Sequence, residues 1–325
     1  MRRCGRPIPG KVSRLLIAVL LLAGSAITAA AQTAGPPQTA DNVVSYVPHR
    51  VYDAKRQGWT DLETMIADVM RADVVFIGEQ HDNVAGHRLQ LAILQGLTRR
   101  RGNIIVALEM FERDVQDSLN SYLAGVTTER DFLASSRPWP RYRQDYRPLV
   151  ELARSYKWPV IAANVPRRLA TAVSRRGLSA LDSLSARDRA FVAREVICPR
   201  DRYYERFAET MRGMPSHRPD SLAVTPAEKQ VAADRMFEGQ CIKDETMAES
   251  IAGGLAKAAP GALVLHINGS FHSDYRLGAA DRTIRRLPGE RVVVLRFVPV
   301  ADLDSIAVAT PDISDYQIFT LAGKP

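Results

Sequence analysis

Apolar residues occur in short runs along the chain, and stretches with helical spacing separate these runs. Buried strands are predicted at residues 73–81, 103–109, 158–164, 262–269 and 291–298, a further edge strand at 316–321, and a short edge hairpin at 47–59. Runs of this kind suit strands that are covered on both faces. Because helical stretches separate the strands, right-handed crossovers and a mostly parallel sheet flanked by helices follow, which is an α/β fold.

Strand patterns are missing from the sequence between residues 178 and 258, where helical spacing continues. Thr225, Pro226 and Glu228 combine an N-cap, a proline at the first helical position and a capping-box glutamate. The helix that begins there is predicted to run to about Gly253. We therefore predict a single domain over residues 46–325, with a helical insertion at about 178–258 that caps the carboxyl edge of the sheet.

Polar side chains follow three of the predicted strands at the point where each strand ends. Glu79 and His81 follow the first run, Glu109 follows the second, and His272 comes shortly after the run at 262–269. Open α/β sheets bind ligands at the carboxyl ends of their strands, so these four side chains are expected to converge. In the alternative reading, Glu79 caps the following helix and His81 packs on it.

Two carboxylates and two imidazoles suit two kinds of chemistry. They can bind a divalent metal such as Zn, Mn or Fe, or they can act as acid and base on a water molecule without a metal. His266 lies inside a predicted strand and is interpreted as a core residue. His87 is six residues from His81 and is assigned a helix-capping role. The residues themselves favour a hydrolytic or metal site.

A segment rich in arginine and aromatic residues lies at 137–147. Tyr142 and Tyr146 are four residues apart and therefore share one helical face. In one reading the segment binds a flat, anionic ligand, with Arg143 and Arg147 taking its carboxylates and the aromatic rings taking its plane. In the other interpretation, the segment is the solvent-exposed beginning of a helix, and its aromatic side chains point inward.

The first 31 residues have the composition of an export signal. They hold five basic residues and no acidic residue, an apolar run from Leu15 to Ala23, and small residues before a predicted cleavage after Ala31. Residues 32–45, rich in Ala, Pro, Thr and Gln, are predicted to be a flexible leader. Ser25 stands where a lipoprotein signal needs cysteine. The sequence therefore predicts a soluble, exported, periplasmic protein.

The formal charge of the whole chain is +8, but the predicted signal carries five of the 44 basic residues. Without them, 39 basic residues face 36 acidic ones, an excess too small to indicate a nucleic-acid partner. Cys4 leaves with the signal, so Cys198 and Cys241 remain. In an oxidising compartment, such an even pair favours a disulfide over a metal or nucleophile pair.

Five motifs, in this order, resemble the ChaN-type haem-binding uptake proteins, which share a superfamily with the Tiki and TraB proteins and the erythromycin esterases. The resemblance extends from about Val47 to Phe297. Its motifs are Gly78-Glu79-Gln80-His81-Asp82-Asn83 with His87-Arg88-Leu89-Gln90, Leu108-Glu109-Met110-Phe111, Ala163-Asn164-Val165-Pro166-Arg167, Lys243-Asp244-x-x-Met247-Ala248, and Asn268-Gly269-x-x-His272.

The resemblance implies a haem-binding protein of an iron-regulated uptake system at the bacterial outer membrane, with cofacial haem stacking in a homodimer. For the haem we predict Tyr146 or Tyr142 as the iron ligand, and Arg143 and Arg147 as partners of the propionates. Relatives in the superfamily are hydrolases, some of them metal-dependent. By the same resemblance, Glu79, His81, Glu109 and His272 occupy the hydrolytic positions, which leaves a hydrolase as the alternative function.

Overall fold

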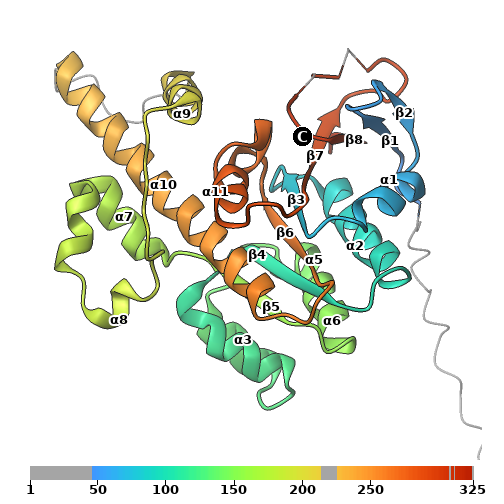
Figure 1. The fold of residues 1–325 in the computed structure, drawn as a ribbon, viewed down its shortest axis with the longest axis horizontal. Coiled ribbons are helices and arrows are strands. Elements are labelled where there is room, and N and C mark those ends of the chain that lie inside the picture. The colour runs from blue at the N-terminus through green and yellow to red at the C-terminus, as the bar shows by residue number, and fades with distance from the viewer. Residues whose placement is uncertain (1–45, 214–224, 307–308, 311, 324–325) are drawn as a thin grey trace, which may run out of the picture. The chain divides into compact units, whose positions relative to one another are not determined.

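The computed structural model describes residues 46–213, 225–306, 309–310 and 312–323 (Figure 1). The predicted signal peptide at 1–31 and leader at 32–45 lie outside these residues. Residues from Tyr46 onward form one compact unit. Its sheet has eight strands: β1 (His49–Asp53), β2 (Gly58–Thr60), β3 (Val74–Glu79), β4 (Ile104–Glu112), β5 (Val160–Asn164), β6 (Leu263–Gly269), β7 (Val292–Val300) and β8 (Tyr316–Leu321).

The strand order is β2-β1-β8-β7-β3-β6-β4-β5. From β8 to β5 all neighbouring strands are parallel, and β1 is antiparallel to both of its neighbours. The prediction of a mostly parallel α/β sheet is confirmed. The prediction that residues 316–321 form an edge strand is wrong, because the β1–β2 hairpin pairs on the outer side of β8 and makes it internal.

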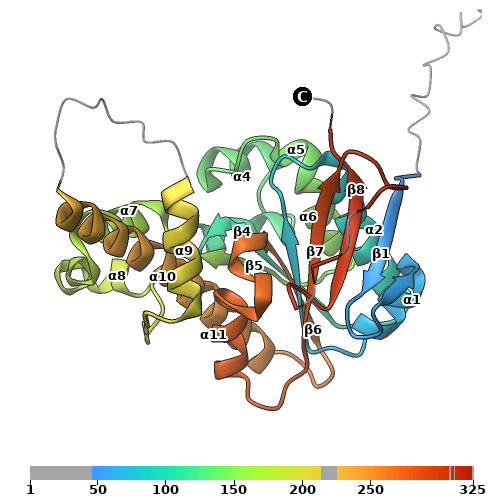
Figure 2. The ribbon, with the colours of Figure 1, turned by 90° about the horizontal axis from the view of Figure 1, so that it is seen from above.

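Helices cover both faces of the sheet (Figures 1 and 2). They are α1 (Leu62–Val69), α2 (Val84–Thr98), α3 (Gln116–Leu123), α4 (Glu129–Ser136), α5 (Tyr142–Asp145), α6 (Arg147–Ser155), α7 (Arg167–Arg176), α8 (Ala186–Arg189), α9 (Arg202–Gly213), α10 (Pro226–Ala256) and α11 (Ala279–Arg286). Single turns of 3-10 helix occur at η1 (Arg113–Val115), η3 (Ser270–His272) and η4 (Asp274–Arg276), and a longer one at η2 (Leu178–Ser183).

Successive residues of β3 show how the two layers share the sheet. Val75 and Ile77 belong to a core cluster with apolar residues of α1, α2 and α6, whereas Val74 and Phe76 pack with residues of α10 and α11. All four side chains are fully buried. Side chains of a strand point alternately to opposite faces, so an apolar run buries residues in both layers at once.

The helical block contains no strand among the described residues between β5 and β6. Its long helix α10 begins with the predicted capping box, in which Thr225 and Glu228 each accept a hydrogen bond from the other's backbone N–H. Met247 and Ile251 in its second half pack against the sheet. The block therefore contributes to the main core as well as to the carboxyl edge.

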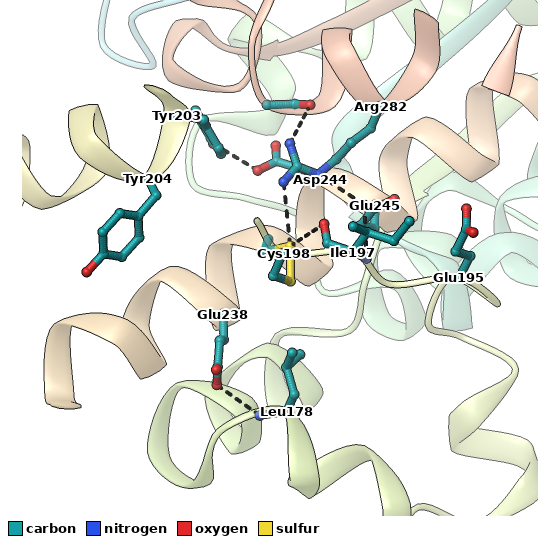
Figure 3. Close-up of a disulfide and its surroundings, with 12 residues drawn as sticks. Leu178, Glu195, Ile197, Cys198, Tyr203, Tyr204, Glu238, Asp244, Glu245 and Arg282 are labelled. Atoms are coloured by element: carbon teal, nitrogen blue, oxygen red, sulfur yellow. Dashed lines mark hydrogen bonds and ion pairs between the residues drawn. A yellow bond between two sulfur atoms is a disulfide. The ribbon is translucent and has the colours of Figure 1, made fainter. Parts of the chain in front are cut away.

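A disulfide joins Cys198 to Cys241, as predicted, and fastens the segment before α9 to α10 (Figure 3). Nearby, the backbone N–H of Ile197 donates to Glu245, whose carboxylate also pairs with Arg282. No helix of the described part is long and apolar enough to span a membrane.

The outer edge of β5 is closed by a side chain. The amide nitrogen of Gln116 donates to the Val160 carbonyl at 2.9 Å, and its oxygen accepts from the Ala162 N–H at 2.7 Å. These are the groups that a further strand would use, so Gln116 stands in the place of a strand neighbour.

Candidate functional site

The structure brings together the four side chains predicted to converge, Glu79, His81, Glu109 and His272, which we call the carboxyl-edge cluster. Glu79 ends β3, Glu109 lies in β4, and His272 lies in η3 directly after β6. Gly78 permits the end of β3 to approach Ser270 closely, because a Cβ atom at position 78 would lie 2.9 Å from the Cα of Ser270. All members except His81 are buried.

Glu79 is held by side chains from three elements. The Tyr146 hydroxyl donates to its Oε1 at 2.6 Å, and Nδ1 of His81 lies 2.8 Å from the same oxygen. The Gln90 amide donates to Oε2 at 2.5 Å, and Nδ1 of His87 lies 3.5 Å from it. A buried carboxylate is costly unless donors surround it, and here Tyr146, His81 and Gln90 supply hydrogen bonds.

Glu109 belongs to a second set of contacts, separate from that around Glu79. Its Oε2 accepts a hydrogen bond from the Gly269 N–H at 2.7 Å, and its Oε1 lies 3.3 Å from Nε2 of His272. Nδ1 of His272 in turn lies 2.6 Å from Oδ1 of Asp244, to which the Tyr203 hydroxyl donates at Oδ2 (2.8 Å; Figure 3 shows the Tyr203–Asp244 contact). One imidazole is thus placed between two buried carboxylates.

These contacts determine the charges of Glu109 and His272. Burial alone lowers the pKa of His272, but the charges of Glu109 and Asp244 outweigh it and raise that pKa to about 10. Burial alone would raise the pKa of Glu109, yet His272 and the Gly269 N–H hold it well below its usual range. At neutral pH, therefore, His272 is a buried cation flanked by two carboxylates.

Gly269 lies between the contacts around Glu79 and those around Glu109. A Cβ atom at this position would lie 3.0 Å from both Cε1 and Nε2 of His81 and 3.7 Å from Oε2 of Glu109. The His81 side chain is 48% exposed, and its ring centroid lies 5.0 Å from that of Trp139. The hydrogen bond to Glu79 raises the pKa of His81. His81 is therefore the member through which the cluster meets solvent.

The predicted divalent metal site is not supported. Among the described residues, no three or more His, Cys, Asp or Glu side chains are grouped so that they could hold a metal ion. The reason lies in the contacts given above, since the oxygens of Glu79 and Glu109 already bind donors of the protein. The arrangement instead suits proton transfer at His81, the one member of the cluster that is not buried.

The arginine-rich segment adopts the inward-facing arrangement. Tyr142 packs against Phe111 and Phe132, while Arg147 pairs with Glu129 at 2.5 Å. Arg143 is exposed. The segment thus presents neither Tyr142 nor Tyr146 to solvent in the described conformation.

The predicted iron ligands Tyr142 and Tyr146 are only 3% and 1% exposed. Burial and the neighbouring Glu79 raise the pKa of Tyr146, which opposes the phenolate that binds iron. Burial likewise raises the pKa of Tyr142. The described conformation therefore gives no support to either residue as an iron ligand, and Tyr146 instead supports Glu79.

Sequence reasoning missed several supporting residues. Asp244 and Tyr203 were not selected, and both come from the helical block. The capping role predicted for His87 is wrong, because Asn83 caps α2 and His87 lies against Glu79. His266 is buried as predicted, and burial lowers its pKa to about 4, so it is neutral.

A group of arginine side chains lies around Tyr275, in η4 between η3 and α11. Tyr275 and Arg276 have φ angles of 61° and 58°, and two consecutive residues in this left-handed region are strained. The guanidinium carbons of Arg206 and Arg202 lie 4.0 Å and 5.1 Å from the centre of the Tyr275 ring. Within the described ranges, neither arginine forms an ion pair. Tyr275 is partly exposed, so two cations and a phenol meet at the surface.

Comparison with solved structures shows similarity of fold. ChaN of Campylobacter jejuni, solved with cofacial heme bound, is 19% identical with a TM-score of 0.62 over 84% of this chain and 97% of that one. An erythromycin esterase in its open conformation is 13% identical (TM-score 0.42; 84% and 83% covered). A bacterial protein toxin is 14% identical (TM-score 0.41; 76% and 38% covered).

No curated protein matches the chain. A family model described as haem-binding uptake, Tiki superfamily, ChaN, matches residues 65–283, which include the whole carboxyl-edge cluster and Tyr275. The match covers well over half of the sequence. The chain therefore belongs to the ChaN family of haem-binding uptake proteins in the Tiki superfamily.

Proposed function

We propose that this protein binds haem and takes part in haem or iron uptake. The observation that carries the proposal is the family match over residues 65–283. The similarity of fold to ChaN of Campylobacter jejuni, whose structure is described as showing cofacial heme binding, is consistent with it. A second copy of this chain as partner, and an outer-membrane uptake system, belong to the same proposal.

The residues around Tyr275 fit the chemistry of haem. Haem needs a donor for its iron, and a tyrosine oxygen serves this purpose in some haem proteins. It also needs cations for its two propionates, for which arginine is well suited. Tyr275, Arg202 and Arg206 supply both within one surface area. In place of the buried Tyr142 and Tyr146, we propose Tyr275 as the iron ligand.

Titration of the purified protein with hemin tests this proposal. The wild type is expected to show a saturable shift of the Soret band at one hemin per chain. Tyr275→Phe removes the donor oxygen and keeps the ring, so the spectrum should change and the affinity fall by roughly tenfold or more, equivalent to about 1.4 kcal/mol.

Tyr156→Phe is the matched control, because Tyr156 is 50% exposed and its ring stacks on Trp158. This variant should titrate like the wild type. Absence of a Soret shift in the wild type would contradict haem binding itself. An unchanged titration in Tyr275→Phe would reject only the ligand assignment.

Export to the periplasm is proposed from the composition of residues 1–31 alone. Five basic residues, the apolar run and the small residues before position 32 are the features that support it. N-terminal sequencing of the protein recovered from the periplasmic fraction would test the proposal.

We propose hydrolysis as a second candidate function, because Glu79, Glu109 and His272 are buried together beside the half-exposed His81. In this role His81 takes a proton from water and Glu79 orients its ring. If the wild type hydrolyses p-nitrophenyl acetate, Glu79→Gln should lower the rate by roughly a hundredfold. Glu209→Gln, on the exposed side of α9, is the control and should leave the rate unchanged.

A further inference from the structure

A groove among the described residues runs beside β4 and β5. It is an open groove of about 1120 Å³. Its walls include the first residues of β4 and β5, the segment before β6, the last turns of α10, and Phe191. Because β4, β5 and β6 are parallel, their amino ends meet at this groove, which also reaches Arg113 after the last residue of β4.

Most of the groove wall is apolar. Ile104, Ile105, Ile161, Phe191 and Leu287 contribute large side chains, and small residues at the end of α10 leave the space open. A Cβ atom at Gly253 would meet nothing within 4 Å. From Glu249 to Ala256, α10 lines about 10 Å of the groove at 1.5 Å per residue. The groove is therefore elongated as well as apolar.

Three arginines, Arg113, Arg194 and Arg286, line the groove together with Glu249. Arg113 pairs with Oε1 of Glu249 at 3.0 Å, and the backbone N–H of Arg194 donates to Oε2 at 2.8 Å. Arg286 pairs with Glu245 at 2.5 Å and donates to the carbonyl of Glu195, next to Arg194. Glu245 is shared with Arg282 and Arg285, so it balances only part of their charge. Glu249 is the one acidic residue among the groove's lining side chains.

The charges of these arginines are not fully balanced. Burial lowers the pKa of Arg113. The neighbouring Arg286 and Arg194 lower it further, whereas Glu249 raises it. The side chain of Arg194 is exposed and has no ion-pair partner in the part of the chain that the structure describes. Lys157 and Lys257 add two exposed cations to the lining. The groove is thus complementary to an anion.

Two other kinds of occupant fit poorly. The lining contains no His, Tyr, Cys or Met side chain, so it offers haem iron no usual ligand. A peptide that adds a strand to β5 finds the Val160 carbonyl and the Ala162 N–H already bound by Gln116. What remains is a small molecule with an anionic head and an apolar body.

We propose that this groove binds a long-chain fatty acid, with its carboxylate at the exposed Arg194, beside Arg113 and Arg286, and its acyl chain along the apolar wall. The proposal is independent of haem binding, since it uses none of the residues around Tyr275 or the carboxyl-edge cluster. It assigns a second ligand site to the groove beside β4 and β5.

Fluorescence titration with cis-parinaric acid, followed by competition with palmitate, tests the proposal on the purified protein. The wild type should bind the probe saturably, and palmitate should displace it at least tenfold more effectively than the neutral methyl palmitate. Arg194→Gln should weaken binding by roughly tenfold, because a charge-assisted hydrogen bond is lost. Arg130→Gln, at a side chain that is 91% exposed and lies outside the groove, should bind like the wild type.

Gly253→Leu provides the decisive variant. Its Cβ atom has free space, so α10 should stay folded while the longer side chain fills the groove and abolishes probe binding. Circular dichroism and an unchanged hemin titration would show that the fold and the proposed haem site are intact. The proposal is overturned if the wild type does not bind the probe saturably, if Gly253→Leu binds it as well as the wild type, or if methyl palmitate competes as well as palmitate.

Discussion

Replacing Cys198 and Cys241 by alanine together is expected to lower the free energy of unfolding by about 4 kcal/mol. The two cysteines are 43 residues apart, and a cross-link over a loop of this length removes much of the conformational freedom of the unfolded chain. The bond also anchors the segment that leads to Tyr203, which donates to Asp244. The double variant should therefore also loosen the support of His272.

Urea denaturation at pH 7 measures the loss. Cys198→Ala alone should cost nearly as much as the double variant, because either change removes the same covalent bond. Wild-type protein treated with a reductant should approach the variants. A loss below about 1 kcal/mol in the double variant would show that the unfolded chain gains little freedom there.

Asp244→Asn is expected to lower the free energy of unfolding by about 3 kcal/mol, since it breaks a buried ion pair and leaves the charge of His272 less well balanced. Asp244 and His272 are both buried, and their side chains approach to 2.6 Å. Asp234→Asn on the same helix is the matched control. It removes a pair with Arg200, whose side chain is 62% exposed, and should cost no more than about 1 kcal/mol.

The pH dependence of stability provides a second readout of Asp244. The pKa of His272 is about 10 in the folded protein against an ordinary value of 6.5, so its contribution is complete below about pH 6.5 and is lost as the pH rises toward 10. The depressed pKa of Glu109 acts at the acid end, where stability falls as the pH drops below its ordinary value of 4.5.

Wild-type stability should therefore fall between pH 7 and pH 10, and Asp244→Asn should flatten this decline. Chemical denaturation at several pH values checks both expectations. Equal slopes in the wild type and the variant would contradict the assignment of a raised His272 pKa to Asp244.

The strands and the convergence of the carboxyl-edge cluster could be predicted because both depend on the local pattern of apolar residues. Each apolar run had to be buried, and parallel strands place their ends together, so Glu79, Glu109 and His272 followed from their positions after the runs. Thr225 and Glu228 marked the start of α10 for a similarly local reason, since a capping box lies within one turn.

The remainder of the site depends on contacts between distant segments. Asp244 lies within a 31-residue helix, and the motif that contains it gives no indication of its contact with His272. One interpretation assigns Tyr146 to a ligand-binding surface because it lies in an arginine-rich segment, yet its hydroxyl donates to the buried Glu79. The position of β8 likewise depends on where the β1–β2 hairpin pairs.

The amide of Gln116 has a consequence for self-association. Two copies of this chain cannot join their sheets across β5 without first displacing that amide, and the opposite border is the three-residue strand β2. A continuous intermolecular sheet is thereby disfavoured at both margins. Any pair of copies that forms around a shared ligand must rest on side-chain surfaces, and it should separate when the ligand is withdrawn.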